Sequence, residues 1–238
     1  MVHTNFKRDD GFGAQFQTIL FSIIYCDLIG GTFQYSPFET VAHNYDNDPG
    51  FIEHKEILIG IRDIFEINSG YAAPTSGAIY HAVEHNLHRL SDFKSFQRVK
   101  DNFYKINPNP FILSENYNVA IHFRNVNPQD IGDYGYTNLA VFKNKMDDIR
   151  ARTLDSDKKP IFHFYSQGSE DKFQSIKSSD VVFHLDESVE ETFRGLVFAD
   201  ELLMSKSSFS YCAGLLNKNY VHYQKFWHLP EPRWELWL

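Results

Sequence analysis

Short apolar runs alternate with amphipathic stretches in the second half of the chain. The apolar runs are rich in β-branched and aromatic residues and predict strands at residues 118–124, 160–166, 180–185, 201–205 and 219–223. Between them, apolar residues recur every three or four positions and predict helices at residues 137–154, 169–177, 187–199 and 208–217. Because strands and helices alternate, the pattern predicts βαβ crossovers and a parallel sheet.

The first half of the chain begins with a similar pattern. Residues 1–6 and 32–36 predict two short strands, and the apolar residues between them predict a helix that ends at Gly30. A turn around Gly11 and Gly13 precedes this helix. Since this glycine pair lacks the third glycine of a dinucleotide-binding fingerprint, it does not by itself indicate NAD binding.

A Pro- and Asn-rich stretch at residues 107–118 separates the two patterns. We therefore predict an α/β fold with two Rossmann-like halves, each built on a mainly parallel sheet. The predicted halves are residues 1–115 and residues 116–238. The last helix or tail of the chain can pack back on the first half.

Composition and charge narrow the range of partners. The 238 residues include 23 Lys and Arg against 31 Asp and Glu, which gives a formal net charge of −8. This charge argues against nonspecific binding to nucleic acid or to anionic membranes, because both need a positive field. A ligand that carries phosphate would therefore have to be held by a local pocket.

The most apolar stretch, residues 16–30, is interrupted by Gln17, Ser22 and Asp27 and follows an acidic segment. We expect it to be too short and too polar to span a bilayer, and its flank has the wrong sign for a secretion signal. Two cysteines cannot form a disulfide framework. We therefore expect a soluble, cytoplasmic protein, or the catalytic domain of a longer precursor.

The loops that follow the predicted strands of the second half are the expected ligand site, because ligands of parallel sheets bind beyond the carboxyl ends of the strands. An arginine and several hydroxyls at helix starts would suit a diphosphate. Serines at these positions are also ordinary helix N-caps, and an arginine there is often paired with a nearby carboxylate. The polar residues and glycine of these loops are Arg124, Asp130, Asp133, Ser166, Gly168, Asp186, Ser205, Ser207 and Ser208.

His81, Glu84 and His85 match the zinc-protease pattern H-x-x-E-H. On a helix the two histidines would share a face, as two zinc ligands must, with Glu84 near a bound water. His88 extends the histidine stripe, and a polar helix face produces the same pattern. We favour the polar face and expect no metal, so a zinc hydrolase remains only an alternative.

Three blocks of the sequence resemble motifs of the fucosyltransferase superfamily of GT-B fold, which includes α-1,2-, α-1,6- and protein O-fucosyltransferases. Residues 11–15 (GFGAQ) resemble its G-x-G-N-Q loop, and residues 119–124 (VAIHFR) resemble its V-x-I-H-x-R strand end. Residues 198–216 resemble its A-D-x-(L/F)-I…S-S-F-S-x-x-A-x-L block. Ala14 stands where the family has asparagine, and Asn127 stands where many relatives have aspartate.

The resemblance implies a role for each matched residue. It implies that Arg124 binds the β-phosphate of a GDP-sugar and stabilises the leaving group, and that His122 lies in the nucleotide pocket. It also implies that Ser207, Ser208 and Phe209 surround the diphosphate, and that Asp200 helps to hold the base. The full set of predicted donor-binding residues is Gly11, Gly13, His122, Arg124, Ser166, Asp186, Asp200, Ser207, Ser208 and Phe209.

We therefore predict an inverting, metal-independent glycosyltransferase that moves a sugar, fucose by resemblance, from a GDP donor to a glycan hydroxyl. The predicted catalytic residues are Arg124 and a carboxylate base, Asp10 or Asp130. The predicted partners are a nucleotide sugar and a glycan acceptor, with no cofactor, no nucleic acid and no membrane span. Another donor such as a UDP-pentose, or a nucleotide- or glycan-binding module without turnover, remains an alternative.

Overall fold

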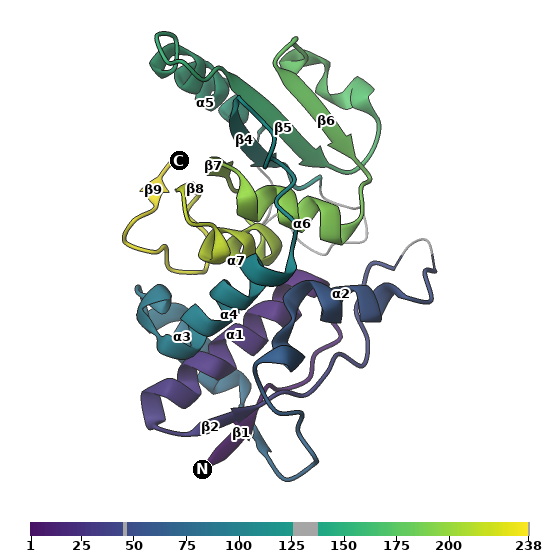
Figure 1. The fold of residues 1–238 in the computed structure, drawn as a ribbon, viewed down its shortest axis with the longest axis vertical. Helices are drawn as coiled ribbons and strands as arrows, with labels where there is room; N and C mark the ends of the chain where they lie inside the picture. The colour runs from purple at the N-terminus through teal and green to yellow at the C-terminus, as the bar shows by residue number, and fades with distance from the viewer. Residues whose placement is uncertain (45–46, 126–137, 238) are drawn as a thin grey trace. The chain divides into compact units, whose positions relative to one another are not determined.

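The structure, a computed structural model, describes all residues except 45, 46, 126–137 and 238. The chain divides into two compact units. The first comprises Met1–Pro108 with Phe226–Pro232, and the second comprises Asn109–Lys225 with Arg233–Leu238 (Figure 1). The main division therefore falls after Pro108, and a short segment near the end of the chain returns to the first unit.

The second unit contains a sheet with the strand order β6-β5-β4-β7-β8-β9, in which every described pairing is parallel. The register sets Ile121 of β4 opposite Leu203 of β7, and His122 opposite Tyr165 of β5. The parallel sheet predicted from the alternation is confirmed. Its strands are β4 (Tyr117–His122), β5 (Pro160–Ser166), β6 (Val181–Leu185), β7 (Glu201–Leu203), β8 (Tyr220–Tyr223) and β9 (Glu235–Leu236).

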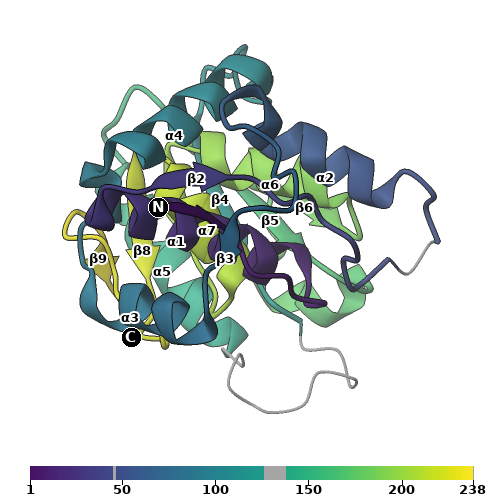
Figure 2. The ribbon, with the colours of Figure 1, turned by 90° about the horizontal axis from the view of Figure 1, so that it is seen from below.

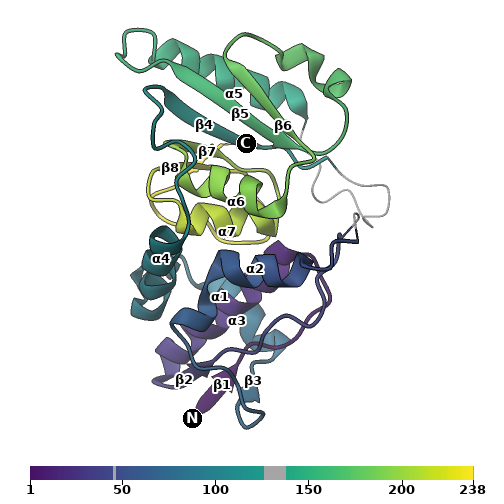
Figure 3. The ribbon, with the colours of Figure 1, turned by 45° about the vertical axis from the view of Figure 1, so that its right-hand side comes forward.

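Helices cover both faces of this sheet. Alternate residues of a strand point to opposite faces, so Val119 and Ile121 pack on one face with the buried residues of α5 (Leu139–Arg152). The short 3₁₀ helix η4 (Glu170–Ile176) packs on that face too. On the other face lie α6 (Val189–Phe198) and α7 (Ser208–Leu216), side by side (Figure 3). The side chain of His122 points to this second face, where it meets α7.

Two helix ends predicted from the sequence, the start of α6 and the end of α1, are confirmed. The Ser188 hydroxyl accepts a hydrogen bond from the backbone N–H of Glu191 at 3.2 Å, so this serine caps α6. Gly30 ends the long helix of the first unit with φ at +63°, in the left-handed region that glycine adopts readily.

The first unit contains a smaller parallel sheet with the order β2-β1-β3 (Figure 2). Helix α1 (Phe12–Ile29) packs against β2 and against the two helices α3 and α4. Beyond β2, the hydrophobic pattern predicts no further elements in this half of the chain. The unit's other elements are β1 (Val2–Thr4), β2 (Thr32–Gln34), α2 (Phe51–Ile59), η1 (Ile61–Asp63), β3 (Ala73–Pro74), α3 (Gly77–Asn86), η2 (Leu90–Asp92) and α4 (Lys94–Ile106).

Helix α1 is the one helix among the described residues that is long and apolar enough to cross a membrane. It begins at Phe12, before the apolar stretch, and so reaches 18 residues. The expectation that this segment is too short and too polar to span a bilayer was therefore wrong by length and composition. Of this 18-residue window, 72% is buried inside the structure. The apolar residues of α1, among them Phe16 and Ile23, form the core of the first unit.

Candidate nucleotide-binding site

The carboxyl ends of β4 and β7 bring together two of the sequence blocks. His122 ends β4, and Ser205 follows β7 on the neighbouring parallel strand. Ser205 Oγ lies 2.8 Å from His122 Nδ1, although the two residues are 83 positions apart. The ring of Phe209, at the start of α7, lies 5.3 Å from the His122 ring. We call His122, Ser205 and Phe209, with Arg124 two residues beyond β4, the strand-end cluster.

The imidazole of His122 is held in its neutral form. Burial lowers its pKa from 6.5 to about 3, and the positive charge of Arg124 acts in the same direction. A neutral imidazole has one N–H donor and one nitrogen acceptor. Because Ser205 occupies Nδ1, the remaining ring nitrogen is the one that a ligand could contact. Arg124 then supplies positive charge to the strand-end cluster at neutral pH.

The start of α7 is held by its serines. Ser207 is the N-cap residue, and its hydroxyl accepts a hydrogen bond from the backbone N–H of Phe209 at 3.2 Å. Ser210 donates to the backbone carbonyl of Ser205 at 3.0 Å. The capping interpretation is therefore right for Ser207. A capped helix start also directs backbone N–H groups and the positive end of the helix dipole away from the helix, toward an anion. Ser208 is the first residue of α7 and is half-buried.

Asp186 connects the loops after β5 and β6 through hydrogen bonds. Its backbone has φ at +56°, and its carboxylate accepts the backbone N–H of Gly168 at 3.0 and 3.2 Å. The backbone N–H of Asp186 donates to the carbonyl of Ser166 at 3.0 Å. Asn125 extends the same connection, because its amide donates to the carbonyl of Gln167 at 2.9 Å. Asp186 therefore supports the shape of this edge, and its carboxylate is already engaged.

Two polar groups complete the edge near Gly168. Ser166 Oγ is buried and has no hydrogen-bond partner among the residues that the structure describes. The ammonium of Lys172 lies beside the loop, since a Cβ added to Gly168 would come within 3.6 Å of its Nζ. Ser166 was among the predicted residues. Lys172 was missed, because it lies inside a predicted helix and no motif marks it.

Asp200 lies at the other edge of the sheet. It immediately precedes β7, and its Oδ2 accepts the backbone N–H of Asn118 at 2.9 Å. His122 lies four positions after Asn118 along β4, which is about 13 Å of extended strand. Asp200 thus joins the amino ends of β4 and β7, and it does not meet the strand-end cluster with which the motif resemblance grouped it.

The predicted residues of the first half lie in the first unit. The carboxylate of Asp10 forms an ion pair with Arg8, and its backbone carbonyl accepts the side-chain amide of Gln15 at 2.7 Å. Gly11 is the N-cap residue of α1, and a Cβ there would come within 2.8 Å of His43 Cδ2. Gly13 is buried in the first turn of α1. The other candidate base, Asp130, lies outside the described residues, as does Asp133.

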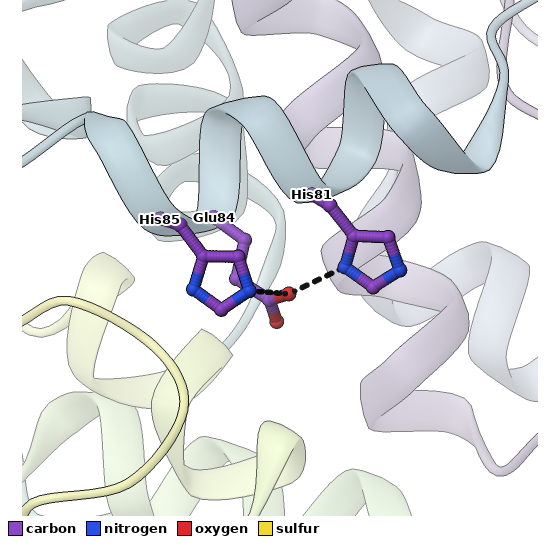
Figure 4. Close-up of side chains that lie close together, drawn as sticks. All are labelled: His81, Glu84 and His85. Atoms are coloured by element: carbon purple, nitrogen blue, oxygen red, sulfur yellow. Dashed lines mark hydrogen bonds and ion pairs between the residues drawn. The ribbon is translucent and has the colours of Figure 1, made fainter.

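The histidine motif falls on α3 of the first unit. His81 and His85 are exposed and share a face of the helix, while Glu84 is buried between them (Figure 4). The two imidazoles turn toward the same carboxylate oxygen, Oε2 of Glu84 (Figure 4). The shared face predicted from the spacing is confirmed. The spacing alone does not predict that the Glu84 carboxylate is buried.

No protein-family model matches the chain, and no curated protein matches it in sequence. Among solved structures, NodZ α-1,6-fucosyltransferase co-crystallised with GDP aligns at a TM-score of 0.44 and 14% identity. A selenomethionine form of the NodZ fucosyltransferase from Bradyrhizobium aligns at 0.42 and 15%, and NodZ soaked with GDP-fucose at 0.41 and 14%. Each alignment covers 91% of this chain and 92% of the other. At this identity the likeness concerns the fold and assigns no residue.

Proposed function

We propose that the protein is a glycosyltransferase that takes its sugar from a GDP-sugar, with the diphosphate bound at the strand-end cluster. One observation carries the proposal. Two blocks that resemble donor-binding motifs, at residues 119–124 and 198–216, meet through the contacts of His122 with Ser205 and Phe209. These contacts lie at the carboxyl edge of a parallel sheet, which is where ligands of such sheets bind.

The chemistry of the edge supports a role in departure of the nucleotide. When the bond between the sugar and the diphosphate breaks, its electron pair leaves with GDP, and negative charge grows on the β-phosphate. Arg124 would donate two parallel hydrogen bonds to these oxygens, and the start of α7 would add backbone N–H groups. Preorganised donors of this kind stabilise a transition state by about 3 kcal/mol each.

The finer assignments follow from the motif resemblance. We propose fucose as the sugar and an inverting transfer that needs no metal. The acceptor hydroxyl would attack the anomeric carbon from the face opposite the diphosphate and lose its proton to a carboxylate. Asp10 and Asp130 are the proposed bases. Of the two, Asp10 forms an ion pair with Arg8.

Calorimetric titration of GDP into the protein in the presence of EDTA tests the donor site. We expect saturable binding that Arg124→Ala abolishes. Lys158→Ala is the matched control, because it removes one exposed positive charge near the amino edge of the same sheet. If both variants lost GDP affinity equally, the loss would reflect net charge and not a specific contact of Arg124. Absence of any nucleotide binding would refute the proposal.

The same protein then distinguishes the alternatives. Binding of UDP in place of GDP would keep the transferase and replace the donor. Binding of GDP without release of GDP from GDP-fucose, across a panel of glycan acceptors, would favour a binding module without turnover. Release of GDP that depends on both the acceptor and Arg124 is the result that we expect.

A further inference from the structure

We propose that His81, Glu84 and His85 form a binding site for a divalent transition-metal ion, best fitted by Zn²⁺, on α3 of the first unit. This site is separate from the proposed transferase chemistry. It consists of two imidazole nitrogens and one carboxylate oxygen, and it leaves further coordination positions open to water. The role that the surrounding contacts support is to fasten α3 to the chain segment Phe226–Pro232.

The distances between the donor atoms suit a zinc ion. His81 Nδ1 lies 3.0 Å from Glu84 Oε2, and His85 Nε2 lies 3.3 Å from the same oxygen. In a tetrahedral zinc site with bonds of about 2.0–2.1 Å, neighbouring donor atoms are about 3.3 Å apart. All three donor atoms already lie within 4.8 Å of one another. The two histidine side chains are exposed, so they can make the remaining adjustment without displacing buried residues.

The two oxygens of Glu84 have different surroundings. Oε1 lies 2.7 Å from Nδ1 of His228 and accepts the hydroxyl of Tyr80 at 3.2 Å. Oε2 faces only the two histidines of α3 among the contacts that the structure records. Ligating carboxylates are usually oriented in this way, with outer partners on one oxygen and the metal on the other. His228 and Tyr80 therefore act as positioning residues for the ligand oxygen.

The charge of Glu84 also calls for a cation. Its side chain is only 4% exposed. A buried negative charge is costly unless a cation compensates it, and a divalent ion does so directly.

The donor set also predicts which ions bind. Imidazole nitrogens favour Zn²⁺, Cu²⁺, Ni²⁺ and Co²⁺, whereas Mg²⁺ and Ca²⁺ prefer sites made of oxygen atoms alone. Hydrogen bonds from the two imidazoles to the carboxylate would give the same contacts without a metal. That arrangement would bind no ion, and titration with a metal therefore separates the two.

The test is calorimetric titration of ZnCl₂ into protein that has been stripped with EDTA, freed of the chelator and freed of any histidine tag. We expect one equivalent of Zn²⁺ per chain and no binding of Mg²⁺. His81→Ala and His85→Ala should each weaken Zn²⁺ binding at least tenfold. Both residues are exposed, so the variants should fold, and circular dichroism checks this. His88→Ala, which removes an exposed histidine just beyond α3, is the matched control and should bind as the unchanged protein does.

A second readout tests the fastening role. Zn²⁺ should raise the thermal midpoint of the unchanged protein and of His88→Ala, but not that of His81→Ala. Absence of Zn²⁺ binding, or binding that survives in both His81→Ala and His85→Ala, would overturn the proposal. Because GDP binding is measured in EDTA, failure of the metal site leaves the proposed transferase untouched, and the reverse also holds.

Discussion

Replacement of His122 by asparagine should remove a specific part of the pH dependence of stability. The folded protein holds the pKa of His122 at about 3, whereas the unfolded value is 6.5. Below pH 6.5 the unfolded chain therefore binds a proton that the folded protein does not, so stability falls as the pH falls from 6.5 toward 3. Between pH 7 and pH 5 this one group costs the folded state about 2 kcal/mol.

This magnitude depends little on the folded pKa, because any value below 4 leaves His122 neutral at pH 5. Asparagine keeps a polar atom near the position of Nδ1, where Ser205 makes its contact, and it has no charge to gain. Urea unfolding at pH 7 and at pH 5 measures both proteins, and the His122→Asn variant should lose about 2 kcal/mol less than the parent. Equal losses would show that His122 is charged, or not buried, in the folded protein, and would refute the electrostatics proposed for the strand-end cluster.

Three further substitutions test other parts of the second unit. Arg124→Ala should lower kcat/KM for GDP release from GDP-fucose by on the order of 100-fold, and a turnover close to normal would exclude this arginine from the leaving-group contact. Glu201→Ala should cost about 1–3 kcal/mol in the free energy of unfolding, because it removes the buried carboxylate that Arg152 and His222 share. Urea unfolding measures this, and an unchanged stability would contradict it. Gly195→Ala should cost about 1–3 kcal/mol by the same measurement, since the new Cβ would overlap the Tyr165 hydroxyl, and an unchanged stability would show that α6 can move away from the sheet.

The sheet of the second unit could be predicted because its signals are local. Each apolar run is bounded by turn residues, and each helix repeats its apolar residues with helical spacing, so residues close in sequence carry the information. The two-residue strand Glu235–Leu236 has no such signal and was missed. The first unit was predicted less well because it also depends on short strands and distant pairings. Its strand β3 is two residues long and pairs with β1 about seventy positions away.

The strand-end cluster could be predicted in outline, because a parallel sheet brings the carboxyl ends of its strands to one edge. Asp200 lies at the opposite, amino edge of the sheet. It stands directly before the predicted strand 201–205, so the topology alone would have placed it at the amino edge, where the structure has it. Asp186 is different: its contact with Gly168 depends on a left-handed backbone turn that nothing in the sequence marks.

The histidine motif shows why spacing alone could not decide between a polar helix face and a metal site. Both interpretations need His81 and His85 on the same face, and the spacing provides this in either case. The distinction depends on whether Glu84 is buried and oriented, which is determined by His228 from the far end of the chain. Glu231 joins the same segment to the first unit through hydrogen bonds to residues about 140 positions earlier. The return of this segment to α3 therefore determines how Glu84 is buried and oriented. Because the contact joins residues far apart in the sequence, no local sequence pattern predicts it or the metal site that depends on it.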